Sequence, residues 1–545
     1  MDSATQPKQS VTQFKQCIAP SSQYDVAVIG AGPQGLLYAS WLKLARPHAR
    51  IIVLERSLTP QHKIGESTLS GFCKALRSVG IQQEVLRSLF FPKNGLGFFH
   101  IDESVTDLAQ AQEYILETFD ETFQVERRVL DSLLLVNARR LGVEVLQGAR
   151  VNLKRSSLSR SGNQIAYHWQ QQDCQLSARL LVDASGPASV LAHHLDTHTK
   201  GHATFQNNAV WGYFKNMRRL GDRTDWQAKA QFARDEYTQH LCFQEGWLWY
   251  IPLVSWQDTP DAELQTLLEQ LLTSTGTLPS QQALVEQFNG APSDVISIGM
   301  VLRDDRDTIY KQQGPQAVFK YYSQKYPAIA QLLDGAELIA GHYTENQHGY
   351  MTRANIRSQA QQMSGDGYLI VGDAAFFVDP LISPGLTGGV ATAYFAAQES
   401  LRVLDGAEAS RQTLINYERF AKRLHEALER DNQLVYMSFN HPESLKLIQR
   451  FQEIDARRHF HQHVEADYSL VDTNVWGILS PQYQKMQQKL WAVMHQAELD
   501  LAQERPMPMQ STTDYESMVS EIHNLLFSYL KQHEELTPYV TQNAA

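Results

Sequence analysis

Three glycines at a fixed spacing mark the first place in this chain that can anchor chemistry. Gly30, Gly32 and Gly35 form a G-x-G-x-x-G pattern directly after the apolar run Tyr24–Ile29. This spacing permits a tight turn, a close approach of a pyrophosphate to the backbone, and close packing of strand and helix. Glu55 ends a second apolar run, twenty residues after the last glycine, where its carboxylate can accept from a ribose hydroxyl. The pattern predicts a site for the ADP part of a dinucleotide; a strand–helix–strand unit that binds nothing is the alternative.

Further groups that can contact such a cofactor lie far along the chain. Ser67, in an Ile-Gly-Glu-Ser loop, can line the pocket or cap the helix that follows. Arg127 stands at a strand–helix junction, where its guanidinium can reach a phosphate or ribityl oxygen or form a surface salt bridge. Asp183 closes one apolar strand, and Gly372 with Asp373 closes another, so that the carboxylates lie where open α/β sheets bind ligands. The glycine turns at Gly30–Gly35 and at Gly372, with the acids Glu55 and Asp373, lie far apart in the sequence, and together they favour the binding of one FAD.

A short loop of prolines and glycines follows the second of these turns. It contains Pro380, Ser383, Pro384 and Gly385, and a helix of small residues is expected to begin near Leu386. The free amides at the start of this helix would face the ring of the cofactor or a bound anion. As pure structure, the same residues would form an ordinary loop before a packed helix.

Three other groups of residues have both a chemical and a structural interpretation. Lys93 occurs in the sequence Pro-Lys-Asn-Gly, which predicts a turn between two aromatic strands, where a lysine is usually solvated. Trp247 and Trp249 share one face of a predicted strand, although paired indoles are more often core than chemistry. A cluster of histidines makes a metal site conceivable, but no carboxylate pattern accompanies it and we predict no metal: the cluster is His459, His461 and His463.

Two kinds of sheet must position these residues. The continuous apolar strands near the N-terminus predict a parallel sheet covered on both faces, whereas residues 202–340 contain alternating aromatic strands typical of an antiparallel sheet that can roof a substrate pocket. The stretch Asp258–Ser293 is polar and helical in pattern, as an insertion would be. The predicted fold class is α/β: a Rossmann-like FAD-binding domain interleaved with an antiparallel-sheet substrate domain, plus a C-terminal helical region.

The expected boundaries follow from these patterns. We expect a disordered tail at 1–22, the FAD-binding domain at 23–90, 123–200 and 341–405, the substrate domain at 91–122 and 201–340, and the helical C-terminal region at 406–545.

Composition narrows the classes of function. The net charge of −11 over 545 residues gives no electrostatic case for nucleic acid or an anionic membrane. No stretch approaches the roughly 18 apolar residues of a membrane span, and the N-terminus lacks the apolar run of a signal peptide. The four cysteines match no zinc or disulfide framework, which suits a reducing cytoplasm: Cys17, Cys73, Cys174 and Cys242.

Several of these motifs together resemble a known superfamily. GAGPQG, IGEST, VERRVLD, LVDASG and GDAAFFVDP are similar to motifs of the flavin monooxygenases of the p-hydroxybenzoate hydroxylase type. The sequence GWLWYIP contains the W-x-W-x-I-P element that distinguishes flavin-dependent halogenases, complete in Trp247, Trp249, Ile251 and Pro252. The Pro-Lys-Asn-Gly segment resembles the one that carries the active-site lysine of that family, which maps onto Lys93.

The resemblance implies an activity. Reduced FAD, O2 and chloride or bromide would give hypohalous acid, and Lys93 would use it to halogenate an electron-rich aromatic ring, either as an ammonium that polarises the acid or as a haloamine. The loop from Pro380 to Leu386 would hold the halide beside the flavin ring. Since no second G-x-G-x-x-G occurs, a separate flavin reductase would supply reduced FAD.

One departure from the family pattern bears on the substrate. Tryptophan halogenases carry a glutamate just before the halide loop's Ser/Thr-Gly, where this chain has Ile382, and Pro384-Gly385 replaces the usual pair. This favours a non-tryptophan substrate, a phenolic or pyrrolic ring that is free or tethered to a carrier protein.

Two other functions are compatible with the motifs. An FAD-dependent aromatic hydroxylase would make Lys93 incidental and the two tryptophans core. A non-catalytic escort or binding protein of the FAD fold would do no redox chemistry.

Overall fold

The apolar run near the N-terminus forms the centre of a parallel sheet. A computed structural model describes residues 23–200, 205–223, 230–287, 293–341, 348–460, 471–503 and 512–532; the expected tail at 1–22 lies outside them. In this sheet β1 (Gln23–Ile29) pairs in parallel with β2 (Ile51–Glu55) and with β8 (Gln172–Asp183). Because β1 is flanked on both sides and its inner residues are buried, the prediction of a central parallel strand is confirmed.

The remaining strands of the first sheet extend it on both sides. The order is β17-β18-β8-β1-β2-β5, with β7 pairing antiparallel to β8 and β6 to β7. Their bounds are β5 Glu144–Gln147, β6 Arg150–Val151, β7 Asn163–Trp169, β17 Ser364–Gly365 and β18 Tyr368–Ile370. A third, small sheet has the order β19-β16-β9, formed by β9 His198–Thr199, β16 Ser358–Ala360 and β19 Phe376–Phe377.

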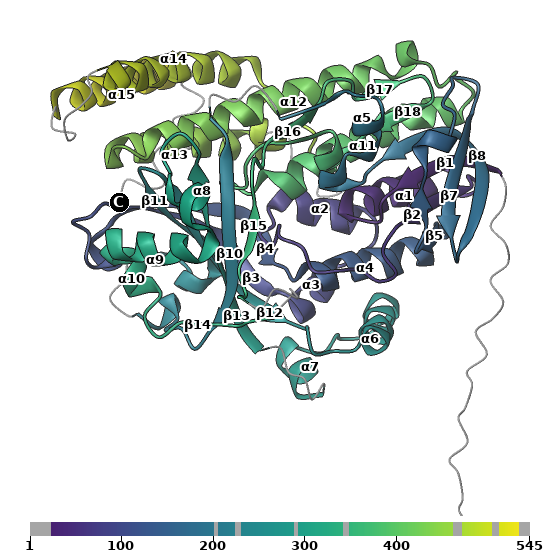
Figure 1. The fold of residues 1–545 in the computed structure, drawn as a ribbon, viewed down its shortest axis with the longest axis horizontal. Coiled ribbons are helices and arrows are strands. Elements are labelled where there is room, and N and C mark those ends of the chain that lie inside the picture. Colours follow the sequence, from purple (N-terminus) through teal and green to yellow (C-terminus); the bar gives the residue numbers. More distant parts are fainter. Residues whose placement is uncertain are drawn as a thin grey trace, which may run out of the picture.

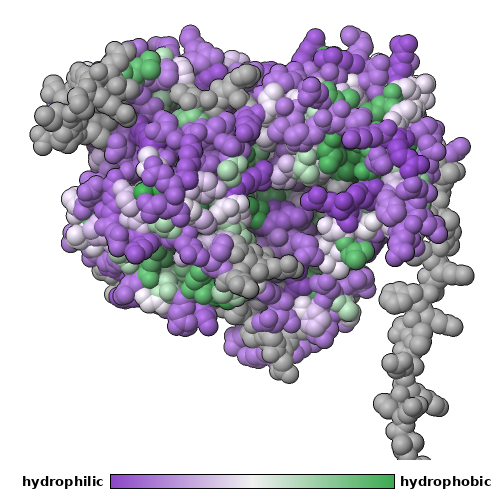
Figure 2. Space-filling model, in the orientation of Figure 1, coloured by the Kyte–Doolittle hydropathy of each residue, from purple (hydrophilic) through white to green (hydrophobic). Residues whose placement is uncertain are grey.

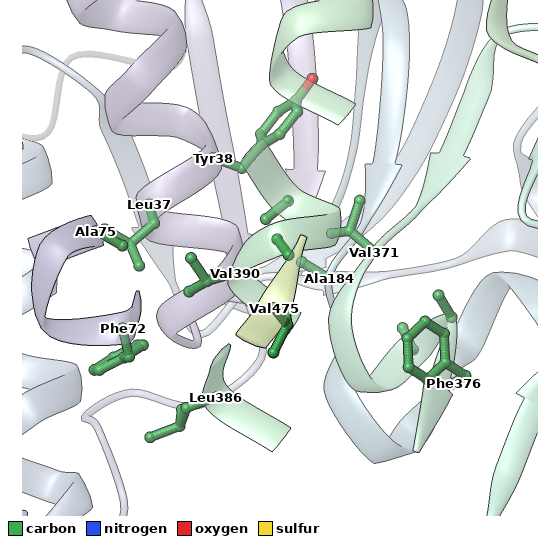
Figure 3. Packing of buried hydrophobic residues seen from close by; sticks show 14 of the residues in the cluster. Leu37, Tyr38, Phe72, Ala75, Ala184, Val371, Phe376, Leu386, Val390 and Val475 are labelled. Carbon is green, nitrogen blue, oxygen red and sulfur yellow. The ribbon is translucent and has the colours of Figure 1, made fainter. Parts of the chain in front are cut away.

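Helices from distant parts of the chain pack against one another beside the first sheet (Figure 1). They are α1 (Pro33–Ala45), α4 (Arg127–Arg140) and α11 (Pro384–Leu404), and α2 (Ser70–Ser78) packs on α11. Figure 3 shows side chains of α1, α2 and α11 gathered in one apolar layer, among them Leu37, Ala75 and Val390. Proline opens both α1 and α11, as expected where the first amide needs no partner.

The second sheet has the order β14-β10-β13-β12-β11-β3-β4, with β15 pairing to β10. The strands are β3 Phe91–His100, β4 Gln112–Gln124, β10 Asn207–Lys215, β11 Tyr237–Phe243, β12 Gly246–Ser255, β13 Ser293–Arg303, β14 Glu337–Leu338 and β15 Met351–Arg353. The prediction of an antiparallel sheet is wrong at one pair, since β3 and β11 run parallel. No hairpin connects these two strands, so no short turn fixes their relative direction.

Strand β12 is buried on both faces, and its alternation separates two cores. Trp247, Trp249 and Ile251 belong to the core shared with the first sheet. Leu248 and Tyr250 face a second core under α8 (Ile309–Gln313), α9 (Pro315–Lys325) and α10 (Pro327–Leu332). Three of the four signature residues, Trp247, Trp249 and Ile251, therefore face the core shared with the first sheet.

The C-terminal region is helical where it is described, as expected. Its helices α12 (Arg411–Ser438), α13 (Pro442–His459), α14 (Pro481–Gln503) and α15 (Thr512–Gln532) lie along one side of the molecule (Figure 1). The residues between α13 and α14 include Val475, which joins the same apolar layer as α11 (Figure 3). This packing brings the C-terminal region against the start of α11.

The remaining helices are short or peripheral. They are α3 (Gln83–Leu89), α5 (Val190–His194), and, within the expected insertion, α6 (Asp261–Thr273) and α7 (Gln281–Gln287). The face shown in Figure 2 is mainly hydrophilic, with hydrophobic residues in small scattered patches. Within the described ranges, none of the helices combines the length and apolarity needed to cross a bilayer.

Candidate active site

The glycine turn after β1 has the shape that a dinucleotide requires. Gly30 has φ +100°, and a Cβ there would lie 2.5 Å from the carbonyl oxygen of Ala184. A Cβ on Gly35 would lie 2.2 Å from the carbonyl oxygen of Gly30, whereas a Cβ on Gly32 would meet nothing within 4 Å. Gly30 and Gly35 are thus required by the protein's own packing, and Gly32 leaves open space beside the start of α1. The turn fits a pyrophosphate at that place.

Glu55, at the end of β2, holds this turn. Its Oε2 accepts from the amide of Ala31 at 2.8 Å and its Oε1 from the amide of Ser57 at 2.8 Å. A carboxylate offers about four acceptor positions, so two remain for a ribose hydroxyl. The ribose contact stays a prediction.

Arg127, which is buried, and Asp373, which is partly exposed, lie close enough to interact electrostatically at the carboxyl end of the first sheet. The Arg127 guanidinium donates to the Asp131 carboxylate at 3.0 and 3.3 Å and to the carbonyl of Ile64 at 3.2 Å. The surface salt bridge considered for Arg127 is therefore wrong, since the pair is buried. Burial raises the pKa of Asp373 to about 6, while Arg127 and Arg353 nearby oppose the shift.

Gly372 precedes Asp373 with φ +60°, and its amide donates to the hydroxyl of Thr392 in α11 at 2.9 Å. Asp183, in contrast, is fully buried and accepts from the amides of Ser185 and Leu191 at 2.9 and 2.7 Å. Asp183 therefore shapes the turn after β8. No contact of the described chain directs it toward a cofactor.

Lys93 does not lie on a turn, and the expectation of a solvated lysine is wrong. It lies inside β3 and has no exposed surface. The sequence misleads here because Gly95 serves close packing: a Cβ there would be 2.5 Å from the carbonyl oxygen of Leu116 and 2.8 Å from the Tyr237 ring. The register shifts between Lys93 and Gly95, which is a bulge in the β3–β4 pair.

The Lys93 amine is held by two oxygens. Nζ donates to the hydroxyl of Ser67 at 2.8 Å and to the carbonyl of Thr68 at 2.6 Å. Burial lowers its pKa to about 7. At neutral pH the amine is therefore divided between its charged and neutral forms.

Ser67 joins this lysine to the proline-containing loop. Besides Lys93, its hydroxyl contacts that of Thr238 at 2.9 Å and that of Ser383 at 3.0 Å. The helix-capping interpretation is wrong, because α2 begins at Ser70 and its N-cap position is Leu69. The predicted cofactor contact of Ser67 stays a prediction; its contacts in the protein are with Lys93 and the loop.

The loop itself contains a residue in an unusual conformation. Ser383 has φ 53° and ψ 39°, the left-handed region that a non-glycine residue rarely occupies, and its amide donates to the carbonyl of Pro380 at 2.8 Å. Pro384 is the first residue of α11, so the helix begins two residues before the expected Leu386. With Gly385 next, the free amides at the start of α11 lie directly after Ser383.

The two signature tryptophans are buried core residues with polar anchors. Their rings lie 5.8 Å apart, and the indole of Trp249 donates to the Ser297 hydroxyl at 3.0 Å. Trp247 donates to the Tyr436 hydroxyl at 2.8 Å, which in turn donates to Asp379 at 3.1 Å. Through Tyr436 of α12, Trp247 is thus linked to the residue before Pro380. Ile251 and Pro252 continue the buried strand.

One residue that interacts electrostatically with Lys93, His240, gave no signal in the sequence. His240 on β11 is buried and stacks on Phe98 with ring centroids 4.5 Å apart. Burial is the main cause that lowers its pKa to about 3, and the charge of Lys93 adds to this effect. His240 is therefore a neutral ring. Asp379 belongs to the GDAAFFVDP motif, but its role becomes visible only through its hydrogen bond from Tyr436 of α12.

A cavity of about 80 Å³ is lined by residues that neighbour the partners of Lys93. Leu69, Leu96 and Ile382 line its inner side, and Gln449 of α13 and Trp476 line the side made by the C-terminal region. Leu69 directly follows Thr68, whose carbonyl holds Lys93. The residue that holds the amine through its carbonyl is thus followed directly by a residue of the cavity wall. The sequence did not predict that the C-terminal helices help to build this cavity.

Among the described residues no group of three potential metal ligands occurs. His459 Nε2 lies 3.1 Å from Asp472 Oδ1; His461 and His463 fall outside the described ranges.

Comparison with known proteins agrees with an FAD-binding oxidoreductase. The family model for an FAD binding domain matches residues 23–228. The crystal structure of halogenase PltM has a TM-score of 0.71 over 94% of this chain and 97% of its own, at 20% identity, which shows the shared fold.

Sequence relatives define the family. Flavin-dependent halogenase malA of Malbranchea aurantiaca is 31% identical over 507 residues, which cover 85% of this chain and 73% of that protein. A chlorinase of Pseudomonas fluorescens, named for a pyrrole-2-carbonyl group on a peptidyl-carrier protein, is 23% identical over 72% of this chain and 79% of its own. The chain belongs to the flavin-dependent halogenases.

Proposed function

We propose that this protein halogenates an electron-rich aromatic ring, phenolic or pyrrolic and free or carrier-tethered, with reduced FAD, O2 and chloride or bromide, and that Lys93 transfers the halogen. The observation that carries the proposal is the buried Lys93 amine, held by Ser67 and Thr68, whose neighbour Leu69 lines a cavity. Two relatives support the substrate class: the carrier-linked pyrrole in one name, and a solved structure of PltM in complex with phloroglucinol and FAD.

The proposed cofactor residues fit one extended dinucleotide. Gly30, Gly32 and Gly35 would hold the pyrophosphate on the first amides of α1, and Glu55 the adenosine ribose. Arg127, Asp183, Gly372 and Asp373 are assigned to the flavin half. When bound and reduced, FAD would supply the two electrons with which O2 is activated, so that O2, a halide ion and a proton give hypohalous acid and water while the flavin is oxidised.

The start of α11 is the proposed place for the halide. A helix of this length carries partial positive charge at its N-terminus, where several amides lack intrahelical partners. Pro380, Ser383, Pro384, Gly385 and Leu386 form this loop and helix start. The Ser383–Ser67 contact connects the site with Lys93.

Both forms of Lys93 have a defined role in the proposed transfer. The ammonium donates a hydrogen bond to the oxygen of hypohalous acid, which weakens the oxygen–halogen bond. The neutral amine instead forms a nitrogen–halogen bond as the oxygen–halogen bond breaks and water leaves. In either case the ring carbon gains the halogen and loses its proton. A pKa near 7 makes both forms available.

The domain assignment is part of the proposal. The FAD-binding segments, 23–90, 123–200 and 341–405, would bind the cofactor, and segments 91–122 and 201–340 would cover the substrate. Reduced FAD would arrive from a separate flavin reductase, so NADH alone should support no turnover until such a reductase is added.

The test is product analysis with chemically or enzymatically reduced FAD, O2, bromide and a panel of phenols and pyrroles. Wild-type protein should give brominated products, and Lys93→Ala none, while flavin oxidation continues. A hydroxylated product that persists in Lys93→Ala would instead establish an aromatic hydroxylase. Purified protein without a flavin spectrum after FAD loading would favour the non-catalytic binding protein.

A further inference from the structure

Four side chains that line the cavity have a buried polar atom without a partner among the described residues, and two of them, Thr387 and Gln449, are fully buried; Thr118 and Gln452 are partly exposed. The amide Nε2 of Gln449, in α13, and the hydroxyl of Thr387, in the first turn of α11, make no hydrogen bond among the described residues. Gln449 is 1% exposed and Thr387 is 2% exposed, and both line the cavity. Native proteins pair nearly all buried polar groups, so these two atoms call for a partner beyond the described residues.

The surroundings orient the Thr387 hydroxyl. A Cβ added to Gly71 of α2 would lie 2.9 Å from the Thr387 Cγ2, so the methyl group faces that helix. The hydroxyl, on the other branch of the same carbon, is then directed away from α2.

The charged groups of the cavity are already engaged by the protein. Asp431 accepts from the Tyr483 hydroxyl at 2.7 and 2.9 Å and from Gln487. Asp472 is paired with His459, and the Lys74 ammonium lies 4.8 Å from the centre of the Phe460 ring. Glu117, the other charged residue of the lining, accepts from the Tyr237 hydroxyl at 3.4 Å, so the charged groups of the cavity have contacts within the protein and do not call for a charged ligand.

We propose that this cavity binds the ring to be halogenated as a neutral aromatic that carries a hydrogen-bond acceptor, and that Gln449 and Thr387 orient it. The inference rests on the proposed halogenase function and adds the substrate's recognition. The amide Nε2 is a donor only, so it selects an oxygen such as that of a phenol or aryl carbonyl. Leu69, Leu96 and Trp476 supply the apolar contacts that an aromatic ring needs.

The test is a binding titration of FAD-loaded protein without halide or reductant. Resorcinol is the probe, and 1,3-dimethylbenzene, which has a similar outline and no acceptor, is the comparison ligand. Gln449→Leu and Thr387→Val should each weaken resorcinol binding about 3- to 10-fold, the range for loss of one neutral hydrogen bond. Gln488→Leu, the same change on the exposed face of α14, should leave the affinity unchanged.

Equal affinity of wild type for the two ligands, or unchanged resorcinol affinity in Gln449→Leu, would overturn the inference. Because binding is measured without turnover, this failure is separate from failure of the proposed function. Brominated resorcinol with an unchanged KM in Gln449→Leu would also overturn the inference and leave the halogenase intact. Gln449-dependent binding without any halogenated product would overturn the proposed function alone.

Discussion

Replacing Lys93 by methionine should change how the protein's stability depends on pH. Lowering the Lys93 pKa from 10.5 to about 7 corresponds to about 5 kcal/mol, at roughly 1.4 kcal/mol per pKa unit. This value is an upper limit on the free energy by which the buried ammonium destabilises the folded protein. Below about pH 7 this cost is fully present in the wild type. Between about 7 and 10.5 the unfolded chain still holds the proton that the folded protein has released.

In that window the unfolded state binds more protons, so the free energy of unfolding rises with pH. Above about pH 7.5, the free energy of unfolding of the wild type should rise relative to that of Lys93→Met by up to about 1.4 kcal/mol per pH unit. Below about pH 6.5, the difference between the two free energies should be constant. Denaturant titrations of both proteins between pH 6 and 9 measure this difference. Lys489→Met, on the exposed face of α14, is the matched control. Parallel pH profiles for wild type and Lys93→Met would refute the reasoning.

Four other substitutions test the rest of the site. Gly32→Ala should keep the fold and lower FAD affinity about tenfold or more, because its Cβ enters only the open space beside the turn. Gly35→Ala should disrupt the turn itself, because its Cβ would meet a backbone oxygen. Circular dichroism and flavin titration separate the two effects, and equal effects would contradict the assignment. Tyr436→Phe should destabilise the protein by about 1–3 kcal/mol and reduce halogenation, since Trp247 and Asp379 both lose a partner; unchanged stability and product yield would count against this link. Ser67→Ala should slow halogenation and leave FAD affinity intact, because the Ser67 hydroxyl contacts Lys93 and Ser383. Product yield and flavin titration measure the two effects. A loss of FAD affinity would instead support the prediction that Ser67 contacts the cofactor.

Local chemistry explains what the sequence predicted correctly. The strand, glycine turn and helix around Gly30 and Gly35 depend on residues within a few positions of one another, so their pattern is visible in the sequence. The same holds for Glu55 at the end of its strand and for Pro384 near the start of α11, which the sequence placed within two residues.

Long-range packing explains what the sequence missed. The sequence around Lys93 has the composition of a turn, and only Leu116 and Tyr237, from other strands, show why glycine is needed at 95. Tyr436 and Gln449 lie in C-terminal helices with no recognisable motif. Tyr436 nevertheless accepts a hydrogen bond from Trp247, and Gln449 lines the cavity. Their roles depend on how α12 and α13 pack against the rest of the chain.

The yield of brominated product per flavin oxidised, compared between wild type and Lys93→Met under identical supply of reduced FAD, tests most directly whether Lys93 transfers the halogen. If Lys93 transfers the halogen, we expect a substantial yield of brominated product for wild type and none for Lys93→Met, with equal rates of flavin oxidation. Brominated resorcinol formed by Lys93→Met at the wild-type yield would contradict it.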